Sequence, residues 1–178
     1  MALRDGQSLT GTTPDAVMKA ITHNVAATLE IRNFTRYNLT NPQTQINAGY
    51  VKIPAEDVEA GVREIMAMHK TDHTATGTSG VVSWLINGSN ERLVIMWSAP
   101  YSFDFHSNWM GVGIQSAGFQ LDAKTFNEMY KGEESWFRRK EFYKDTNQLV
   151  LQGRNIIVTA TMGTTHKADI VVEVKPVQ

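Results

Sequence analysis

The chain has 178 residues, a length typical of one domain, and a domain of this size buries roughly 70% of the surface of its unfolded chain. Its 17 Lys and Arg residues nearly balance its 18 Asp and Glu residues, which excludes an overall field that would draw it to nucleic acid or to an anionic membrane. The absence of cysteine excludes disulfides, thiolate nucleophiles and thiolate zinc sites. No stretch approaches the ~20 apolar residues that a membrane-spanning helix needs, so we expect the chain to fold first in water.

The pattern near the N-terminus predicts an amphipathic helix over about residues 14–27. Thr13 is a suitable N-cap residue, Pro14 fits the first helical position, and Asp15 places an acid in the first turn. Apolar residues recur every four positions and form a stripe along one face. These residues are Val17, Ile21 and Val25. We expect residues 1–27 to form a tail and this helix ahead of the main body.

Beyond this helix, short runs rich in β-branched and apolar residues alternate with turn residues, a pattern typical of a β-sandwich or barrel. The predicted strands cover residues 28–32, 45–53, 62–69, 80–86, 93–98, 110–115, 155–161 and 169–174. The run Asn87-Gly88-Ser89-Asn90 predicts a hairpin turn between two of them, because Asn and Gly tolerate positive φ.

A second helix is predicted over about residues 122–131, where Asp122 is suited to cap the N-terminus. Phe126 and Tyr130 share one face of this helix by their i, i+4 spacing. Gly132 is suited to end it.

The sequence contains no internal repeat, low-complexity stretch or linker that would mark a second domain. We therefore expect one mostly β domain over residues 1–178. Within it, a β-sandwich over residues 28–178 is flanked by the two predicted helices.

The segment from Trp97 to Met110 combines five aromatic side chains with a Pro and several small polar residues, and it is too irregular for one strand. A loop that holds so many rings cannot bury all of them. Trp and Tyr rings suit the headgroup level of a bilayer, because they have an apolar body and a polar tip. Ring faces also attract a quaternary ammonium group such as choline, by roughly 0.5 to 2 kcal/mol per ring. The segment therefore predicts either a loop that binds membranes or headgroups, or a loop that is merely aromatic.

Two runs within this region carry a family resemblance. Residues 94–101, Val-Ile-Met-Trp-Ser-Ala-Pro-Tyr, and residues 107–109, Ser-Asn-Trp, closely resemble the signature of the actinoporins, a family of pore-forming cytolysins. At the level of pattern the resemblance extends over about residues 28–174. It implies a compact β-sandwich with two flanking helices that docks on phosphocholine lipids, often sphingomyelin. It also implies oligomerisation on the membrane into a pore lined by N-terminal helices.

The resemblance assigns a headgroup pocket to individual residues of this chain. The pocket that it implies consists of Ser79, Ser98, Pro100, His106, Phe126 and Tyr130. His106 and Phe126 stand where the family has tyrosines, so phenol hydroxyls are lost, although Phe126 keeps a ring face for choline. His106 adds a group that is sensitive to pH.

The resemblance also implies a surface in contact with the membrane. Its residues are Phe105, Trp109, Met110, Arg138, Arg139 and Lys140. Trp109 occupies the place of a membrane-contacting Trp, while Phe105 and Met110 stand where further tryptophans are usual. The three cations replace an Arg-Gly-Asp segment of the family, and on an anionic surface each would contribute about 1 kcal/mol by pairing with lipid phosphates. A solvated charge run is the alternative interpretation.

Two functions follow from these patterns. The first is a pore-forming protein that docks through the aromatic loop, oligomerises and inserts its N-terminal helix, with Val17, Ile21 and Val25 facing lipid. A helix over residues 14–27 spans only about 21 Å, however, against a hydrocarbon core of ~30 Å, and Pro14 opposes its extension toward the N-terminus. Because this length argues against easy insertion, the alternative function is a non-lytic, lectin-like module that recognises a lipid headgroup or a glycan.

The partners predicted are membranes that contain sphingomyelin or phosphatidylcholine, and further copies of the chain on the membrane; nucleic acid is not expected. We expect a secreted protein that is soluble until it binds a target-cell membrane. The first residues show no secretory signal, so cytoplasmic storage stays open. No cofactor, metal or enzymatic activity is expected, because nucleophile elbows and phosphate-binding glycine loops are missing. His69 and His73 lie in loop-like surroundings, where helical ligand spacing has no meaning.

Overall fold

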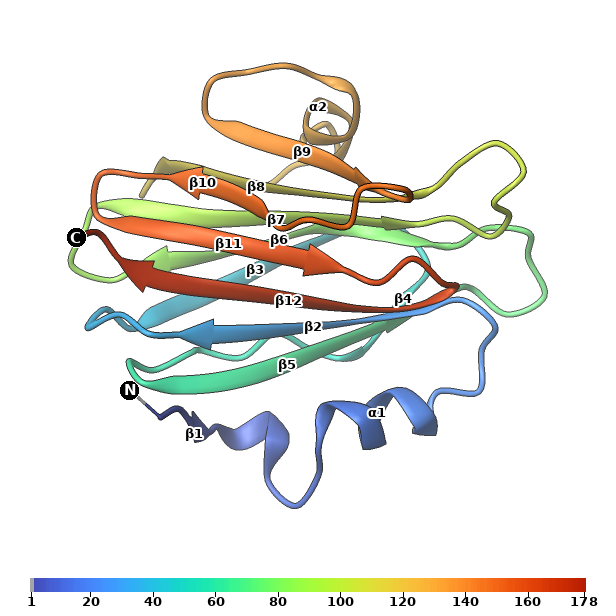
Figure 1. Ribbon diagram of the computed structural model, residues 1–178, viewed down its shortest axis with the longest axis horizontal. Coiled ribbons are helices and arrows are strands. Elements are labelled where there is room, and N and C mark those ends of the chain that lie inside the picture. Colours follow the sequence, from blue (N-terminus) through green and yellow to red (C-terminus); the bar gives the residue numbers. More distant parts are fainter. Residues whose placement is uncertain (1) are drawn as a thin grey trace.

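Two β-sheets packed face to face form the protein, and one α-helix lies outside each sheet (Figure 1). The computed structural model describes residues 2–178. The helices are η1, a 3-10 helix (Gln7–Leu9), α1 (Pro14–Ala20) and α2 (Thr125–Lys131). The strands are β1 (Arg4–Asp5), β2 (Ala26–Asn33), β3 (Leu39–Ala48), β4 (Tyr50–Ile53), β5 (Val62–His69), β6 (Thr78–Ile86), β7 (Glu91–Ala99), β8 (Asn108–Ser116), β9 (Phe137–Phe142), β10 (Leu149–Gln152), β11 (Ile156–Met162) and β12 (Lys167–Pro176). The predicted fold, a mostly β sandwich flanked by two helices, is confirmed.

The first sheet has the strand order β1-β5-β2-β12-β11-β10, with β4 also paired to β5. Two of its pairs are parallel, β1 with β5 and β12 with β2, and the others are antiparallel. The second sheet has the order β3-β6-β7-β8-β9 and is antiparallel throughout. α1 contacts β2 and β5 of the first sheet, and α2 contacts β6 to β9 of the second. Each helix therefore covers the outer face of a different sheet.

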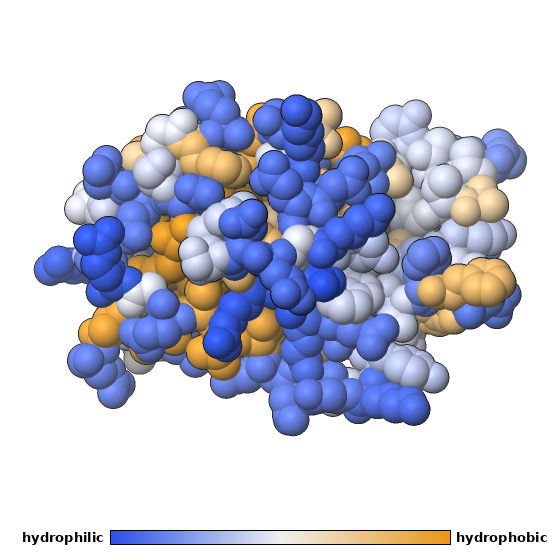
Figure 2. Space-filling model, turned by 90° about the horizontal axis from the view of Figure 1, so that it is seen from above, coloured by the Kyte–Doolittle hydropathy of each residue, from blue (hydrophilic) through white to orange (hydrophobic). Residues whose placement is uncertain are grey.

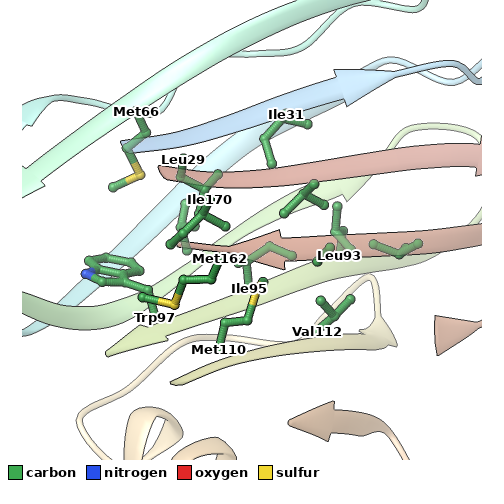
Figure 3. Packing of buried hydrophobic residues seen from close by; sticks show 14 of the residues in the cluster. Leu29, Ile31, Met66, Leu93, Ile95, Trp97, Met110, Val112, Met162 and Ile170 are labelled. Atoms are coloured by element: carbon green, nitrogen blue, oxygen red, sulfur yellow. The ribbon is translucent and has the colours of Figure 1, made fainter. Parts of the chain in front are cut away.

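The main core fills the space between the two sheets (Figure 3). Trp97 and Met110 from the second sheet pack there with Met162 and Ile170 from the first. The buried indole N–H of Trp97 donates a hydrogen bond to Thr78 Oγ1 at 3.1 Å, so its polar atom is satisfied. Burial of an apolar side chain of this size contributes roughly 1.5–3 kcal/mol, and this core anchors the inner faces of β7 and β8.

The inner strands follow the predicted runs. β5 has the predicted bounds, and the turn over residues 87–90 joins β6 to β7 as a hairpin. The predicted strand over residues 45–53 is instead divided between β3 and β4 at Gly49, which has φ of 87°. A Cβ at this position would lie 2.3 Å from the carbonyl oxygen of His69, so only glycine permits the close approach.

The sequence pattern did not predict three strands, β1, β9 and β10, which all lie at sheet edges. β9 reads Phe-Arg-Arg-Lys-Glu-Phe, with charged residues on both faces. Edge strands commonly carry charge, because it discourages pairing with strands of other chains. The same charge removes the apolar alternation by which a strand is recognised.

α1 begins as predicted but ends early. The side chain of Thr13 caps it, since Thr13 Oγ1 accepts a hydrogen bond from the Ala16 N–H at 3.1 Å. The helix has 7 residues and ends at Ala20, so the predicted end near residue 27 is wrong. At 1.5 Å per residue it is only about 10 Å long. Within residues 2–178, every helix is too short or too polar to cross a membrane.

The segment after α1 is held by the main body instead of continuing the helix. Ile21 has an extended backbone, and Lys167 Nζ donates a hydrogen bond to its carbonyl oxygen at 2.6 Å. The carbonyl oxygen of Val25 accepts a hydrogen bond from the Lys70 N–H at 3.0 Å. These tertiary hydrogen bonds replace the helical ones, which explains the early end.

The predicted apolar stripe is therefore divided between two clusters. Val17 and Ile21 lie outside the first sheet, in a small cluster whose other members are Leu9, Met18, Ala26, Ile65 and Ala67. Val25 belongs instead to the core between the sheets. Its assignment to the helix stripe is wrong.

The residues ahead of α1 are bound to the edge of the first sheet rather than forming a loose tail. β1 pairs in parallel with the start of β5. The Glu64 carboxylate accepts hydrogen bonds from the N–H and the Oγ of Ser8 at 3.0 and 2.9 Å. Ser8 Oγ in turn accepts a hydrogen bond from the Ile65 N–H at 2.7 Å. This clamp joins the N-terminal segment to β5.

α2 begins three residues later than predicted, at Thr125. Asp122 still stabilises its start, because Asp122 Oδ1 accepts hydrogen bonds from the N–H groups of Lys124 and Thr125 at 2.8 and 3.1 Å. These bonds lower the pKa of Asp122, and the hydrogen bond to Lys124 is the main cause. Gly132 ends the helix as predicted, because a Cβ there would lie 2.4 Å from the Glu128 carbonyl oxygen.

Candidate functional site

A row of side chains crosses the outer face of the second sheet, near the end where the β7–β8 loop projects (Figure 1). Strand register places its members directly opposite one another. The row consists of Ser79, Ser98, Trp109 and Glu141. Because Trp97 and Met110 point into the core, their neighbours Ser98 and Trp109 point outward. We call these four residues the cross-strand row.

Two rings from α2 extend the row. The Tyr130 ring meets the half-buried Trp109 ring edge-on, with centroids 6.1 Å apart and an interplanar angle of 76°. It also stacks on Phe126, with centroids 5.3 Å apart and planes 13° apart. Phe126 is only 6% exposed and packs with Met129 between α2 and the sheet. The structure thus brings Ser79, Ser98, Phe126 and Tyr130 together around Trp109.

Pro100 lies one residue beyond the end of β7 and is half-buried, so it borders this group. Ser98 is 9% exposed and Ser79 is 7% exposed, and Ser79 Oγ accepts a hydrogen bond from Asn47 Nδ2 at 2.9 Å. The two serine side chains are therefore buried, whereas the rings of Trp109 and Tyr130 are half-buried.

The run of cations on β9 is used in three different ways. Lys140 Nζ forms an ion pair with Asp145 at 2.8 Å, and this hydrogen bond lowers the pKa of Asp145. Arg139 points toward α2 and donates hydrogen bonds to the carbonyl oxygens of Tyr130 and Gly132. Arg138 is exposed, with one long hydrogen bond of 3.4 Å to a carbonyl of β10. Of the three, Arg138 has the charge most accessible to a lipid phosphate.

A hollow of about 620 Å³ lies beside Trp109, between β9 and the loop that follows α2. Trp109 and the three β9 cations line it together with Glu133. The hollow therefore combines an indole ring with both signs of charge.

In the β7–β8 loop, one aromatic ring is exposed to solvent and two others contact the rest of the protein. Phe105 is 88% exposed, which is the largest value among the exposed apolar residues of the described chain. Phe103 stacks on His166 with centroids 3.9 Å apart, and Lys70 Nζ lies 5.6 Å from the Tyr101 ring centroid. These contacts hold the loop against the body. Figure 2 shows that the face carrying α2 is largely hydrophilic, with apolar patches toward the left, while the end that carries the loops, at the right, is of intermediate hydropathy with isolated apolar side chains.

His106 does not join the cross-strand row. It is exposed and lines a second hollow of about 540 Å³ with Phe105, Tyr143, Lys144 and Glu141. Because Glu141 belongs to the row, His106 lies at the border of the row and not within it.

The position of Met110 differs from the predicted one. Its side chain is fully buried in the core between the sheets, so its predicted position on the membrane-contacting surface is wrong for this structure. The cause is strand alternation, because neighbouring residues of β8 point to opposite faces and Trp109 takes the outer one.

A group of histidines lies near the segment that follows α1. His23 Nε2 is 2.5 Å from Asp72 Oδ1, and the His23 ring stacks on His69 with centroids 3.8 Å apart. The hydrogen bond from His23 is the main cause of a lowered pKa for Asp72. Among residues 2–178, no cluster of His, Cys, Asp and Glu is arranged to hold a metal ion.

The sequence interpretation missed two residues beside the site. Tyr143 is 60% exposed at the end of β9, where an aromatic residue beside Lys144 was the available signal. His166 supports the aromatic loop from the β11–β12 turn. Arg139 was predicted as a membrane-contacting cation, but its contacts with α2 depend on a strand that the pattern did not reveal.

The comparisons with known proteins agree with this geometry. The family model described as sea anemone cytotoxic protein matches residues 2–175. Tereporin-Ca1 of Terebra anilis is 36% identical over 180 residues, which cover 96% of this chain and 94% of that protein. Conoporin-Cn1 of Conus consors is 33% identical over 158 residues, which cover 86% of this chain but 64% of that protein.

Among solved structures, the crystal structure of the lipid binding protein Nakanori matches with a TM-score of 0.69. It covers 85% of this chain and 71% of that chain at 11% identity, so it supports the fold alone. The family match, in contrast, covers nearly the whole chain and includes the motif that carries the resemblance. The chain belongs to the sea anemone cytotoxic protein family, the actinoporin-like cytolysins.

Proposed function

We propose that this protein is a pore-forming cytolysin that docks on choline-headgroup membranes with the cross-strand row, the α2 rings and the β7–β8 loop. The observation that supports this most directly is the gathering of Trp109, Tyr130 and the exposed Phe105 at one end of the sandwich. We propose action outside the producing cell, as a secreted protein without enzymatic activity. Copies of the chain then assemble on the target membrane.

Docking combines two kinds of contact. The Phe105 ring enters the interface, where removal of apolar area from water contributes about 25 cal/mol per Å². The Trp109 and Tyr130 rings present faces and edges to the choline group through cation–π attraction. The Ser98 hydroxyl donates to the phosphate, and Arg138 adds an exposed cation beside it.

Insertion follows docking in this proposal. The apolar residues of α1, Val17 and Met18, pack on the first sheet in water and exchange that contact for lipid after release. Release breaks the hydrogen bonds of Ser8 with Glu64 and of Lys167 with Ile21. Because α1 is about 10 Å long, the residues ahead of it have to join the helix before it spans a ~30 Å hydrocarbon core.

The same two hydrogen-bonded clamps favour a second candidate function. A protein whose N-terminal segment stays bound to β5 recognises the membrane without crossing it. In that case the chain is a non-lytic module for a lipid headgroup or a glycan, and the same row and loop do the recognition.

One paired experiment separates the two functions. Sedimentation with sphingomyelin–phosphatidylcholine vesicles measures binding, and release of an entrapped dye from the same vesicles measures pore formation. A pore former gives both signals, and Trp109→Ala lowers both to the same degree. Saturating binding without dye release in any choline-lipid mixture leaves the recognition module as the function. If neither vesicles nor soluble phosphocholine bind, the pore former and the lipid-headgroup module both fail, and a glycan-binding module is left.

A further inference from the structure

Arg139 contacts three groups of the candidate site at once. Its Nε donates a hydrogen bond to the Gly132 carbonyl oxygen at 3.0 Å, and its Nη1 donates one to the Tyr130 carbonyl oxygen at 2.9 Å. Its Cζ atom lies 4.9 Å from the centroid of the Trp109 ring. The first two groups belong to the end of α2, whereas the ring belongs to β8. A single side chain from β9 therefore joins the helix to the strand.

The local sequence makes this reach possible. In the register of β8 and β9, Arg139 lies opposite Gly111, which has no side chain to occupy the outer face. Trp109 is on the same face of β8 as Gly111, two residues away. The guanidinium can therefore pass over the strand, beside the indole, to the last turn of α2.

The chemistry of this contact is specific to arginine. The planar guanidinium directs N–H donors in its plane toward carbonyl oxygens, while its flat surface lies against an aromatic ring. The carbonyl groups at a helix C-terminus have no helical partner and favour a nearby cation. The ammonium group of a lysine carries the same charge but does not provide both contacts with this geometry.

The contacts of Arg139 with α2 and Trp109 also affect the rings that pack beside them. Trp109 touches Tyr130 edge-on, and Tyr130 stacks on Phe126. Fixing the end of α2 against Trp109 thus fixes the separation of the two half-buried rings. Among residues 2–178, Arg139 has no carboxylate within ion-pair distance, so its polar contacts are these carbonyl groups.

We propose that Arg139 is a positioning residue of the headgroup site, which holds Trp109 and Tyr130 at their binding separation, rather than a cation that attracts lipid phosphates. This inference rests on the proposed function. It assigns different roles to adjacent arginines: Arg138 interacts with the membrane surface by charge, and Arg139 acts by geometry.

The test uses charge-preserving and charge-removing variants of both arginines in the full chain. Vesicles of sphingomyelin and phosphatidylcholine, which are zwitterionic, are compared with vesicles that also contain phosphatidylserine. Arg139→Lys is expected to lower binding to zwitterionic vesicles about tenfold, at low and high salt alike, and Arg139→Gln to lower it as much. Arg138→Gln weakens only the salt-sensitive binding to anionic vesicles, and Arg138→Lys keeps the charge that this binding needs. The matched control is Arg154→Lys, at an exposed arginine of the β10–β11 turn outside the site, and it changes binding less than about twofold.

A second readout needs no membrane. The protein has 4 tryptophans, and Trp109→Phe identifies the indole N–H resonance of Trp109 in a heteronuclear NMR spectrum. Arg139→Lys is expected to shift this resonance and to leave the other three in place, which also shows that the variant is folded. The control Arg154→Lys leaves all four unchanged.

The outcomes separate this inference from the proposed function. An Arg139→Lys variant that binds like the wild type, with an unmoved Trp109 resonance, overturns the positioning role. Equal, salt-sensitive losses for Arg138→Gln and Arg139→Gln, with no loss for either Lys variant, also overturn it and show attraction by charge. Failure of the wild type to bind choline vesicles overturns the proposed function, while the resonance still decides whether Arg139 positions Trp109.

Discussion

At the scale of single residues, the site depends on which face of a strand each side chain occupies. Trp109 and Met110 are neighbours in β8, yet one contacts α2 and the other lies in the core. Phe105, whose ring is exposed, lies in a loop, so its exposure does not depend on the alternation of a strand. Binding and stability therefore separate cleanly between adjacent positions.

Phe105→Ala is expected to weaken vesicle binding severalfold, because the ring loses the apolar area that enters the interface. Its free energy of unfolding, measured with urea, is expected to change by less than about 0.5 kcal/mol, as for most surface substitutions. Val177→Ala, at an exposed apolar residue beside the C-terminus at the other end of the sandwich, is the control and keeps wild-type binding. Unchanged sedimentation of Phe105→Ala would remove the ring from the docking surface.

Met110→Ala is expected to lower stability without lowering vesicle binding. It leaves a cavity in the core and lowers the free energy of unfolding by about 2–5 kcal/mol. Binding per folded molecule stays at the wild-type level, because Trp109 keeps its outer position. A variant that folds with unchanged stability but loses vesicle binding contradicts the buried placement of Met110.

At the scale of elements, the N-terminal segment is attached by the pairing of β1 with β5, by polar contacts at its two ends and by a small apolar cluster between them. The Ser8 hydrogen bonds with Glu64 and Ile65 hold its start, and the hydrogen bond from Lys167 holds the residue after α1. Between them, α1 buries little beyond Val17 and Met18. Such an element has a low free energy of local opening compared with the core strands.

Lys167→Met is expected to loosen the C-terminal end of α1, because Ile21 loses the donor to its carbonyl oxygen while the apolar stem of the side chain is preserved. Hydrogen exchange of the amides in α1 then speeds up about tenfold, whereas that of β7 and β8 amides does not change. Lys175→Met, on the same strand near its other end, is the control. Equal protection of α1 in both variants would show that Lys167 does not hold the helix.

Asp72 gives the segment after α1 a dependence on pH. The pKa of Asp72 is lowered in the folded state, first by the hydrogen bond from His23 and then by its charge, with smaller contributions from His73 and His69. Stability from this carboxylate is therefore present above the unfolded Asp pKa of about 3.9 and is lost as pH falls through the lower folded pKa. Two lysines also contact this segment or its neighbours: Lys70 Nζ donates to the Thr71 carbonyl oxygen, and Lys167 Nζ donates to the Ile21 carbonyl oxygen.

Asp72→Asn is expected to remove this dependence. At pH 6 the variant exposes the amides after α1 to exchange more readily than the wild type, and the difference disappears once the pH is low enough to protonate the wild-type carboxylate as well. Because Asp72 is exposed, the effect is small, and Asp57→Asn, at another exposed acid, is the matched control. A difference between wild type and Asp72→Asn that does not shrink as the pH is lowered rules out the carboxylate as the cause.

At the scale of the whole molecule, the two helices lie on opposite sides of the sandwich, each against a different sheet (Figure 1). In the proposed function, α2 contributes to the binding site and stays in place. α1 lies against the other sheet, so its proposed release would leave that site intact. The architecture is therefore compatible with docking and insertion as separate steps.

A disulfide between α1 and β5 tests this separation. The chain has no cysteine, so two introduced cysteines with Cα atoms about 5.5–6 Å apart form the only possible pair. The oxidised protein is expected to bind vesicles like the wild type without releasing dye, and reduction restores the release. Equal release from oxidised and reduced protein means that α1 does not need to leave the sheet.

The sequence by itself determined the class of fold, the inner strands, the hairpin over residues 87–90, the N-cap of α1 and the end of α2 at Gly132. These features depend on neighbours within a few positions, such as the Thr13 hydroxyl and the alternation along β5. The motif over residues 94–101 and 107–109 also indicated the family, because it needs no knowledge of distant contacts.

Only the tertiary structure decided where α1 ends, which edge strands form, and how the residues of the site divide between the two faces of β8. Val25 continues the helical period in sequence, but hydrogen bonds from distant strands give it a place in the core instead. β9 has no apolar alternation, and it forms because its backbone pairs with the edge of β8. Arg139 could therefore be recognised as a cation from its sequence, but not as the link between Trp109 and α2, since that role depends on strand register across residues far apart in the chain.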